Sequence, residues 1–176
     1  QKVMEIFKEL TEKGFKAGDR IYSLLINLYF RSGQEQQAWR LLDQFKRYNK
    51  YPSYFVSLVI VNHLSNHCNE MKRAEKIVKS LPHGILSSYH YVFLVKGYVR
   101  NHQYDDALNV IQDMRNRKLA PTLEVYQHLL HEYVDTGDVN GLEALLGVLV
   151  ADRTLSPEDP MITCYRIAAS AVSGQV

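Results

Sequence analysis

The sequence predicts an all-α protein, a solenoid of helix-turn-helix repeats with a period of about 35 residues. Three observations predict this fold. Apolar residues recur in quartets with the i, i+3, i+4, i+7 spacing of one helical face. The quartets come in pairs, and successive pairs begin about 35 residues apart. Glycine and proline recur between the quartets, in places where they end helices.

The elements follow in order along the chain. A half repeat, residues 1–19, is expected first, then full repeats at 20–54, 55–88, 89–123 and 124–158, and a half repeat at 159–176. The half repeat at the start carries one second-helix quartet: Val3, Ile6, Phe7 and Leu10. The first-helix quartets are Tyr22, Leu25, Ile26, Tyr29; Ser57, Ile60, Val61, Leu64; Tyr91, Leu94, Val95, Tyr98; Tyr126, Leu129, Leu130, Tyr133; and Met161, Cys164, Tyr165, Ala168. The second-helix quartets of the full repeats are Ala38, Leu41, Leu42, Phe45; Ala74, Ile77, Val78, Leu81; Ala107, Val110, Ile111, Met114; and Leu142, Leu145, Leu146, Leu149. Because no pair buries its apolar face alone, neighbouring pairs must cover one another.

Turn residues keep the same period. Gly33 and Gly137 occupy one slot between paired helices, where positive φ would end the first helix. Pro52 and Pro121 share the slot before the next repeat, where proline is expected to stop the second helix. The first residues are typical of the middle of a helix, so we expect the chain to be part of a longer protein whose targeting segment is missing.

This pattern resembles the pentatricopeptide repeat family. The resemblance is carried by the tyrosines, glycines and alanines of the repeats and by the exits "YPS" and "APT": Tyr22, Tyr91, Tyr126, Gly33, Gly137, Ala38, Ala74 and Ala107. Tetratricopeptide repeats, of 34 residues, are the nearest alternative, but the placement of proline and the repeat length favour the first family. The resemblance implies a right-handed superhelix whose first helices line a groove that binds single-stranded RNA.

In that family, the bases are read two residues after the first-helix tyrosine and at the last residue of each repeat. These positions are here Leu24 and Tyr54, Val59 and Ser88, Phe93 and Leu123, His128 and Glu158, and Thr163. Apolar Leu24, Val59 and Phe93 cannot form hydrogen bonds with base edges. We expect packing between repeats for these three, although Phe93 also suits stacking on a base. A one-base-per-repeat code is therefore not expected.

Two further slots form a polar stripe along the first helices, mildly basic in the middle and acidic at its end. One slot holds Arg31, Asn66, Arg100 and Asp135, and the other holds Asn27, Asn62, Lys96 and His131. Because phosphate binding needs cations along the groove, Arg31 and Arg100 are the leading phosphate ligands. Solvated helix ends explain the same two arginines equally well. The full set of RNA-binding candidates is Asn27, Arg31, Asn62, Asn66, Phe93, Lys96, Arg100, His128, His131 and Thr163.

Composition and the remaining motifs argue against other classes of function. The net charge of +2 neither requires nor excludes a polyanionic partner. The segment "HLSNHC", with His63, His67 and Cys68, lacks a full ligand set, so no metal is expected. We expect no catalytic residues, no cofactor and no insertion into a membrane. Trp39 is expected to pack in the core, and Cys68 and Cys164 to be buried or half-buried.

The sequence therefore predicts a binding module and not an enzyme. The family resemblance implies an organellar factor, in the mitochondrial matrix, that binds a transcript and acts on mRNA stability, processing or translation. A degenerate animal-type member fits the apolar base-reading positions. The alternative is a scaffold that holds a protein partner on the same helical surface, because solenoids offer extended binding faces.

Overall fold

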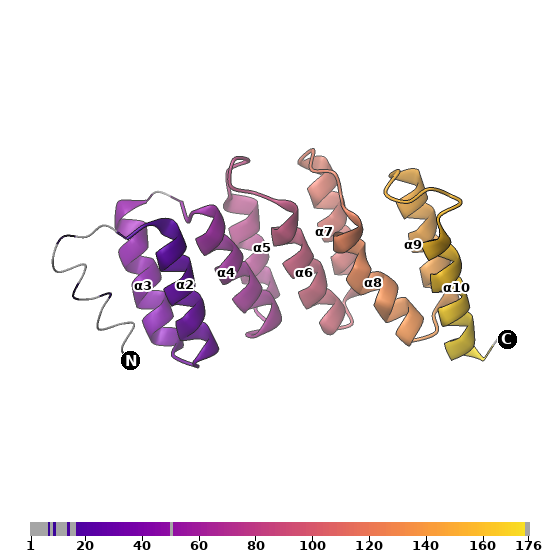
Figure 1. Ribbon diagram of the computed structural model, residues 1–176, viewed down its shortest axis with the longest axis horizontal. Helices are drawn as coiled ribbons and strands as arrows, with labels where there is room; N and C mark the ends of the chain where they lie inside the picture. The colour runs from indigo at the N-terminus through magenta and orange to yellow at the C-terminus, as the bar shows by residue number, and fades with distance from the viewer. Residues whose placement is uncertain (1–6, 8, 10–13, 15–16, 50, 175–176) are drawn as a thin grey trace. The chain divides into compact units, whose positions relative to one another are not determined.

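The computed structural model describes residues 7, 9, 14, 17–49 and 51–174. Within these residues the chain is helical, without a strand (Figure 1). The helices are α2 (Asp19–Arg31), α3 (Glu35–Tyr48), α4 (Tyr54–Asn66), α5 (Met71–Ser80), α6 (Ser88–Arg100), α7 (Tyr104–Asn116), α8 (Leu123–Asp135), α9 (Val139–Ala151) and α10 (Pro160–Ser173). The chain divides within α4 into two compact units, Gln1–Ile60 and Val61–Val176, which are considered in turn.

None of the helices in the described ranges combines the length and the apolar character that a bilayer crossing requires.

The first unit contains α2, α3 and the start of α4. The second-helix quartet of α3 is buried, as are Leu25 and Ile26 of α2. The Trp39 ring packs edge-to-face on Phe30, with 5.3 Å between ring centroids, which confirms its packing role. The Arg20 guanidinium lies 4.8 Å above the centroid of the Phe55 ring and joins α2 to α4. In the half repeat at the start of the chain, Val3, Ile6 and Leu10 lie outside the described residues.

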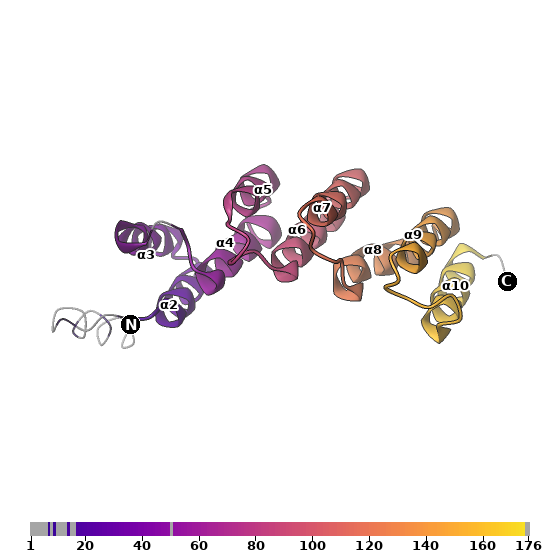
Figure 2. The same ribbon diagram turned by 90° about the horizontal axis from the view of Figure 1, so that it is seen from above.

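The second unit is built in two layers. Viewed from above, α6, α8 and α10 form one layer and α5, α7 and α9 form the other (Figure 2). Helix α6 contacts α5, α7 and α8, while α8 contacts α6, α9 and α10. The predicted quartets of α6, α7, α8 and α9 are all buried. Burial from both neighbours supplies the hydrophobic stabilisation that a single helix pair lacks.

Left-handed backbone ends the first helix of each described pair. Gly33 and Gly137 have φ of 73° and 67°, as predicted. Asn69 and His102 adopt φ of 56° and 55° at the corresponding turns, so the geometry recurs without glycine. The prediction for the prolines was wrong. Helices α3 and α7 end well before Pro52 and Pro121, and Lys118, at φ 59°, already turns the chain after α7.

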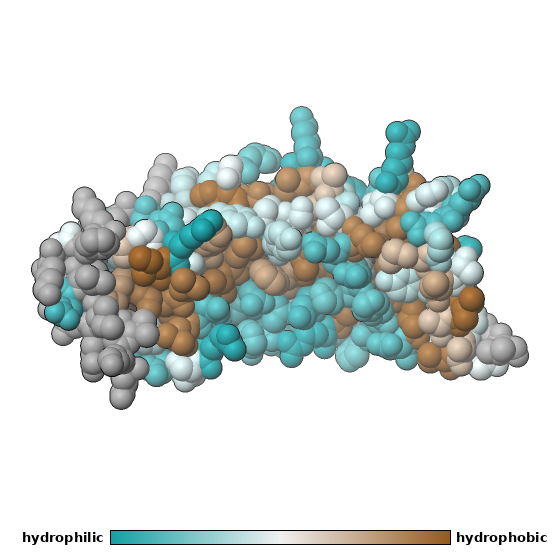
Figure 3. All heavy atoms as spheres, in the orientation of Figure 1, coloured by the Kyte–Doolittle hydropathy of each residue, from teal (hydrophilic) through white to brown (hydrophobic). Residues whose placement is uncertain are grey.

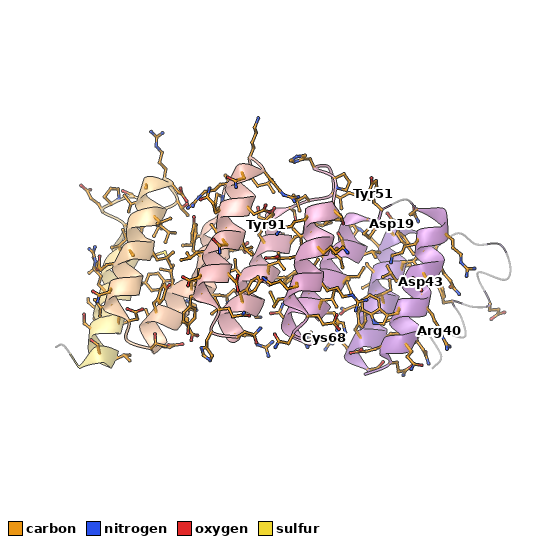
Figure 4. The ribbon with its side chains drawn as sticks, turned by 180° about the vertical axis from the view of Figure 1, so that it is seen from behind. Asp19, Arg40, Asp43, Tyr51, Cys68 and Tyr91 are labelled. Carbon is orange, nitrogen blue, oxygen red and sulfur yellow. The ribbon has the colours of Figure 1, made fainter. Side chains whose placement is uncertain are left out.

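Buried tyrosines link the two layers through carboxylates. Figure 4 labels Tyr91, whose hydroxyl donates to Asp113 Oδ2 of α7 at 3.1 Å. In the next repeat, the Tyr126 hydroxyl donates to Asp152 Oδ2 at 2.5 Å. The Tyr98 hydroxyl reaches back to Glu75 Oε1 of α5 at 2.9 Å. Each bond satisfies a phenol whose ring is buried, which a buried tyrosine requires. Burial, followed by the neighbouring carboxylates, raises the pKa of these hydroxyls, so they remain protonated donors.

Helix α10 departs from the prediction. It buries Ile162 and Ala169 against its neighbours, whereas Met161 and Tyr165 are only half-buried and Cys164 is exposed. The expectation that Cys164 is buried was therefore wrong. Cys68 is half-buried, as expected. The physical reason is that Ile162 and Ala169 are the buried residues of α10, whereas its predicted quartet lines an open hollow toward α8 and is therefore only partly covered.

Helices α4 and α6 approach closely at Gly97. A Cβ atom added there would lie 2.7 Å from the Ser65 carbonyl oxygen and 2.6 Å from Met71 Sδ. Since the Ser65 carbonyl is backbone, it cannot move aside as a flexible side chain does. Gly97 thus sets the distance between these helices, whereas Gly147 of α9 faces open space.

We therefore predict opposite effects of alanine at these two glycines. Gly97→Ala should lower the free energy of unfolding by about 1–3 kcal/mol, because the added methyl overpacks the helix contact. Gly147→Ala should raise it by about 0.5–1 kcal/mol through helix propensity alone. Urea unfolding followed by circular dichroism measures both changes. Equal effects of the two substitutions would contradict the close approach at Gly97.

His90 is a buried titratable group at the start of α6. Its side chain is 0% exposed, and its Nδ1 accepts a hydrogen bond from the Ser87 backbone N–H at 3.1 Å. Burial lowers the pKa of His90 to about 4, although the bond with Ser87 opposes this shift. The native state therefore holds a neutral imidazole at pH values where the unfolded chain is already protonated.

We predict that this histidine makes the protein less stable in mild acid. Between pH 6.5 and about 4 the unfolded state binds one more proton than the native state, so stability falls as the pH is lowered. The slope is at most about 1.4 kcal/mol per pH unit. His90→Gln keeps an acceptor at the same position of the capping box and removes the titration. Thermal unfolding at a series of pH values should show a flatter profile for His90→Gln, and an unchanged profile would contradict the assignment.

Candidate nucleic-acid interface

The RNA-binding candidates lie on first helices. In the first unit, Asn27 is half-buried and Arg31 exposed on α2. The candidates of the second unit lie on four helices: Asn62 and Asn66 on α4; Phe93, Lys96 and Arg100 on α6; His128 and His131 on α8; and Thr163 on α10. Hydrophilic surface gathers over α6 and α8 (Figure 3). The RNA-binding candidates of the second unit therefore all lie on first helices of the repeats.

Asn66 is engaged with protein groups and not with solvent. Its side chain is 7% exposed, and its amide donates to Asn62 Oδ1 at 3.0 Å and to the Phe93 carbonyl at 3.5 Å. The Arg100 guanidinium donates to the Asn66 backbone carbonyl. Arg100 thereby caps the end of α4, where backbone carbonyls lack helical partners. These contacts give Asn66 a structural role. Arg100 also has a structural role, in addition to any contact with phosphate.

Lys96, His128 and His131 form a compact group of basic side chains on α6 and α8. Lys96 and His131 are exposed, and His128 is half-buried. The pKa of His128 is lowered by burial first, then by the charge of Lys96 and by His131. The smaller, electrostatic part of this lowering of the pKa comes from neighbouring positive charge, which a bound anion would offset. Half-buried Phe93 lies on α6, one turn before Lys96.

The corresponding face of α2 is aliphatic. Leu24 is 67% exposed and Leu28 48% exposed, and Ile21 completes an exposed row on this helix. The expectation that Leu24 packs between repeats was therefore wrong, because its side chain points out of the first unit. Val59 and Phe93, the other apolar base-reading positions, are half-buried. Figure 3 shows the hydrophobic surface over α2.

The histidines near the end of α4 pack on one another and on a thiol. His63 and His67 stack, with 5.8 Å between ring centroids. His63 Nε2 lies 3.1 Å from Cys68 Sγ, and Cys68 is labelled in Figure 4. His63 is buried and His67 exposed. Within the second unit these contacts join the residues of the motif "HLSNHC" at the turn between α4 and α5.

Sequence reasoning missed a hollow between α8 and α10. It has a volume of about 360 Å³ and is lined by residues of both helices, among them His131, Asp135 and Tyr165. The sequence pattern places Tyr165 in an apolar quartet and Asp135 at the acidic end of the polar stripe. Arg166 of α10 also stands in a stripe slot, but it forms a two-point ion pair with Glu143 of α9, at 2.5 and 2.7 Å. The periodic slot alone could have identified Arg166, but not its partner Glu143.

Known proteins provide an independent comparison. Two family models match the chain: a pentatricopeptide repeat domain over residues 84–136 and a PPR repeat over residues 20–49. Two pentatricopeptide repeat-containing proteins of Arabidopsis thaliana are also similar. One, named as chloroplastic, is 21% identical over 90% of this chain, and the other is 24% identical over 78%. The chain spans about a quarter of the length of these relatives, since it covers 25% of each.

Solved structures show the same fold. The maize pentatricopeptide repeat protein PPR10 superposes with a TM-score of 0.77 and 18% identity over 96% of this chain and 24% of its own. A second structure, of PPR10 in complex with an 18-nt psaJ RNA element, gives a TM-score of 0.73 at 17% identity, covering 97% of this chain and 26% of that one. This likeness confirms the predicted all-α solenoid of helix-turn-helix repeats.

The basic group on α6 and α8 predicts a measurable coupling. Lys96→Gln should raise the pKa of His128, because one of the charges that lower it is removed. The matched control is Lys76→Gln, which removes an exposed lysine of α5. NMR signals of the histidine rings, followed through a pH titration, give the pKa of His128 in each of the two variants. If Lys96→Gln leaves the pKa of His128 where it was, the two side chains do not approach as described.

Proposed function

This chain belongs to the pentatricopeptide repeat family, and on that premise we propose that it binds single-stranded RNA on the solvent-exposed side of α6, α8 and α10. One observation carries the proposal: Lys96, His128 and His131 gather on adjacent first helices. The Lys96 ammonium attracts a phosphate backbone, and the imidazole N–H groups of the two histidines can donate hydrogen bonds to phosphate oxygens. The maize relative named above was solved with an RNA element, which supports the same class of ligand.

The chemistry of the face suits a single strand better than a duplex. Phe93 is half-buried beside Lys96, so part of its ring remains open to stack on an unpaired base. Hydrogen-bonding groups are few and irregular, because Leu24, Val59 and Phe93 occupy base-reading positions. Affinity is therefore expected to depend on phosphate contacts and stacking more than on base edges. The segment would act by binding, without chemistry of its own.

The biological setting is the finer part of the proposal. We propose an organellar factor that acts on the stability, processing or translation of a transcript, in the mitochondrial matrix. Family resemblance supports an organelle, and one Arabidopsis relative is named as chloroplastic. Fluorescence imaging of the full-length protein, with mitochondrial and plastid markers where both organelles exist, tests the compartment. Exclusion from both would reject it.

A second candidate function is a protein-binding scaffold. The observation that favours it is the exposed aliphatic row of Ile21, Leu24 and Leu28 on α2. Exposed apolar patches mark surfaces for protein partners more often than for phosphates. Under this alternative, RNA binding would be absent while the row on α2 remained necessary for partner binding.

Salt-titrated RNA binding tests the leading proposal. Affinity for a single-stranded oligonucleotide should fall with salt, with a slope of about −0.7 per phosphate neutralised. Lys96→Gln should reduce the magnitude of that slope by about 0.7. Fluorescence anisotropy measures it, and Lys76→Gln on α5 is the control for charge. Arg31→Gln tests whether the first unit contributes to RNA binding.

The outcomes separate the two candidate functions. A slope that changes with Lys96 but not with Lys76 supports binding on the face of α6 and α8. If Lys96→Gln and Lys76→Gln reduce the salt slope equally, the effect is one of nonspecific charge and the proposed site is rejected. Absence of any salt-dependent RNA binding by the folded chain rejects the proposal and favours the scaffold.

A further inference from the structure

The hollow between α8 and α10 has the build of a small-molecule site. Helices α8 and α10 lie side by side in the second unit (Figure 1). Their facing side chains line a hollow of about 360 Å³ that is open to solvent, and this volume lies within the range of about 300–1,000 Å³ typical of ligand sites. Met161 and Ala168 provide apolar walls. The His131 and Tyr165 rings meet at 6.2 Å between centroids, tilted by 42°.

The aromatic pair offers a surface for a flat ring. Tyr165 is half-buried and His131 is exposed, so both rings are partly covered by protein and partly open. Burial raises the pKa of the Tyr165 hydroxyl, which keeps the side chain neutral. A heterocycle placed here gains stacking on one face and contact with Met161 below. Such contacts are the usual way in which proteins hold an unpaired base.

Asp135 determines which edge of a ring the hollow accepts. It is the last residue of α8, and its carboxylate forms no hydrogen bond or ion pair with residues that the structure describes. A carboxylate only accepts hydrogen bonds. The end of α8 adds the negative pole of the helix dipole. The hollow therefore repels phosphate and attracts an edge that carries N–H donors.

Among RNA bases, guanine matches this requirement best. Its N1–H and N2 amino group stand side by side and present two parallel donors to the two oxygens of a carboxylate. Adenine and cytosine offer one exocyclic amino group next to an acceptor, and uracil offers one N–H between two acceptors. A bidentate contact with a charged acceptor is stronger than a single neutral one.

We propose that the hollow selects guanine, with Asp135 accepting from N1–H and N2–H and with His131 and Tyr165 packing on the ring. This inference rests on the RNA-binding function proposed above. The site is separate from the base-reading positions, which are His128 and Thr163 on these helices. It places one base-specific contact in a face that otherwise binds the backbone.

Inosine provides the test, because it differs from guanosine only by the missing N2 amino group. Affinities are measured for a ten-nucleotide uridine tract that carries one central guanosine, inosine or adenosine. The wild-type chain should prefer guanosine to inosine by about tenfold, the effect of one hydrogen bond to a charged group. Asp135→Asn should abolish that preference. Asp105→Asn, at an exposed aspartate of α7, is the matched control and should keep it.

The outcomes distinguish this inference from the function beneath it. If binding is salt-dependent and sensitive to Lys96 but equal for guanosine and inosine, guanine selection is wrong and the RNA face stands. If the folded chain binds none of the oligonucleotides, both guanine selection and the proposed RNA binding are wrong. Guanosine, which carries no phosphate, should also shift the His131 ring signals in NMR. A response to acetylated arginine amide alone would assign the hollow to a protein partner and overturn the inference.

Discussion

Every feature of the second unit depends on the mutual covering of helices that cannot be stable singly. Helix α6 is packed against α5, α7 and α8, and its tyrosines at positions 91 and 98 are fully buried. Burying a phenol is favourable only if its hydroxyl finds a partner. The carboxylates of Asp113 and Glu75 supply those partners from the second-helix layer. The buried rings and the hydrogen bonds of their hydroxyls thus hold the same two layers of helices together.

The same packing leaves one face of the first helices open for function. Since the second helices cover one side and neighbouring first helices cover the flanks, side chains on the remaining side meet solvent. In the second unit that side carries Lys96, His128 and His131, and the pKa of His128 is lowered by burial first and then by its two neighbours. On α2 the corresponding side carries Leu24 and Leu28. A net charge of +2 conceals this contrast, because the difference lies in distribution and not in the sum.

The candidate site was predictable in part. Periodic slots correctly placed Lys96, His128 and His131 on first helices, because residues at equal positions of a repeat take equal positions in the fold. The slots failed for Leu24, which was expected to pack and is 67% exposed. They also failed to show that Asn66 is buried and bonded to α6. Periodicity says where a residue stands on its helix, but not how closely the next helix approaches it.

Local signals in the sequence were enough to determine the helices, their pairing and the buried quartets of α6, α7, α8 and α9, because the 3.6-residue period and the glycine turns act within one repeat. The tertiary structure alone decided which polar groups meet: Arg100 with the end of α4, Arg166 with Glu143, and Asp135 with the hollow beside Tyr165. These contacts join residues of different helices, and most join different repeats. They depend on helix separation, which a single backbone contact such as that of Gly97 with Ser65 sets.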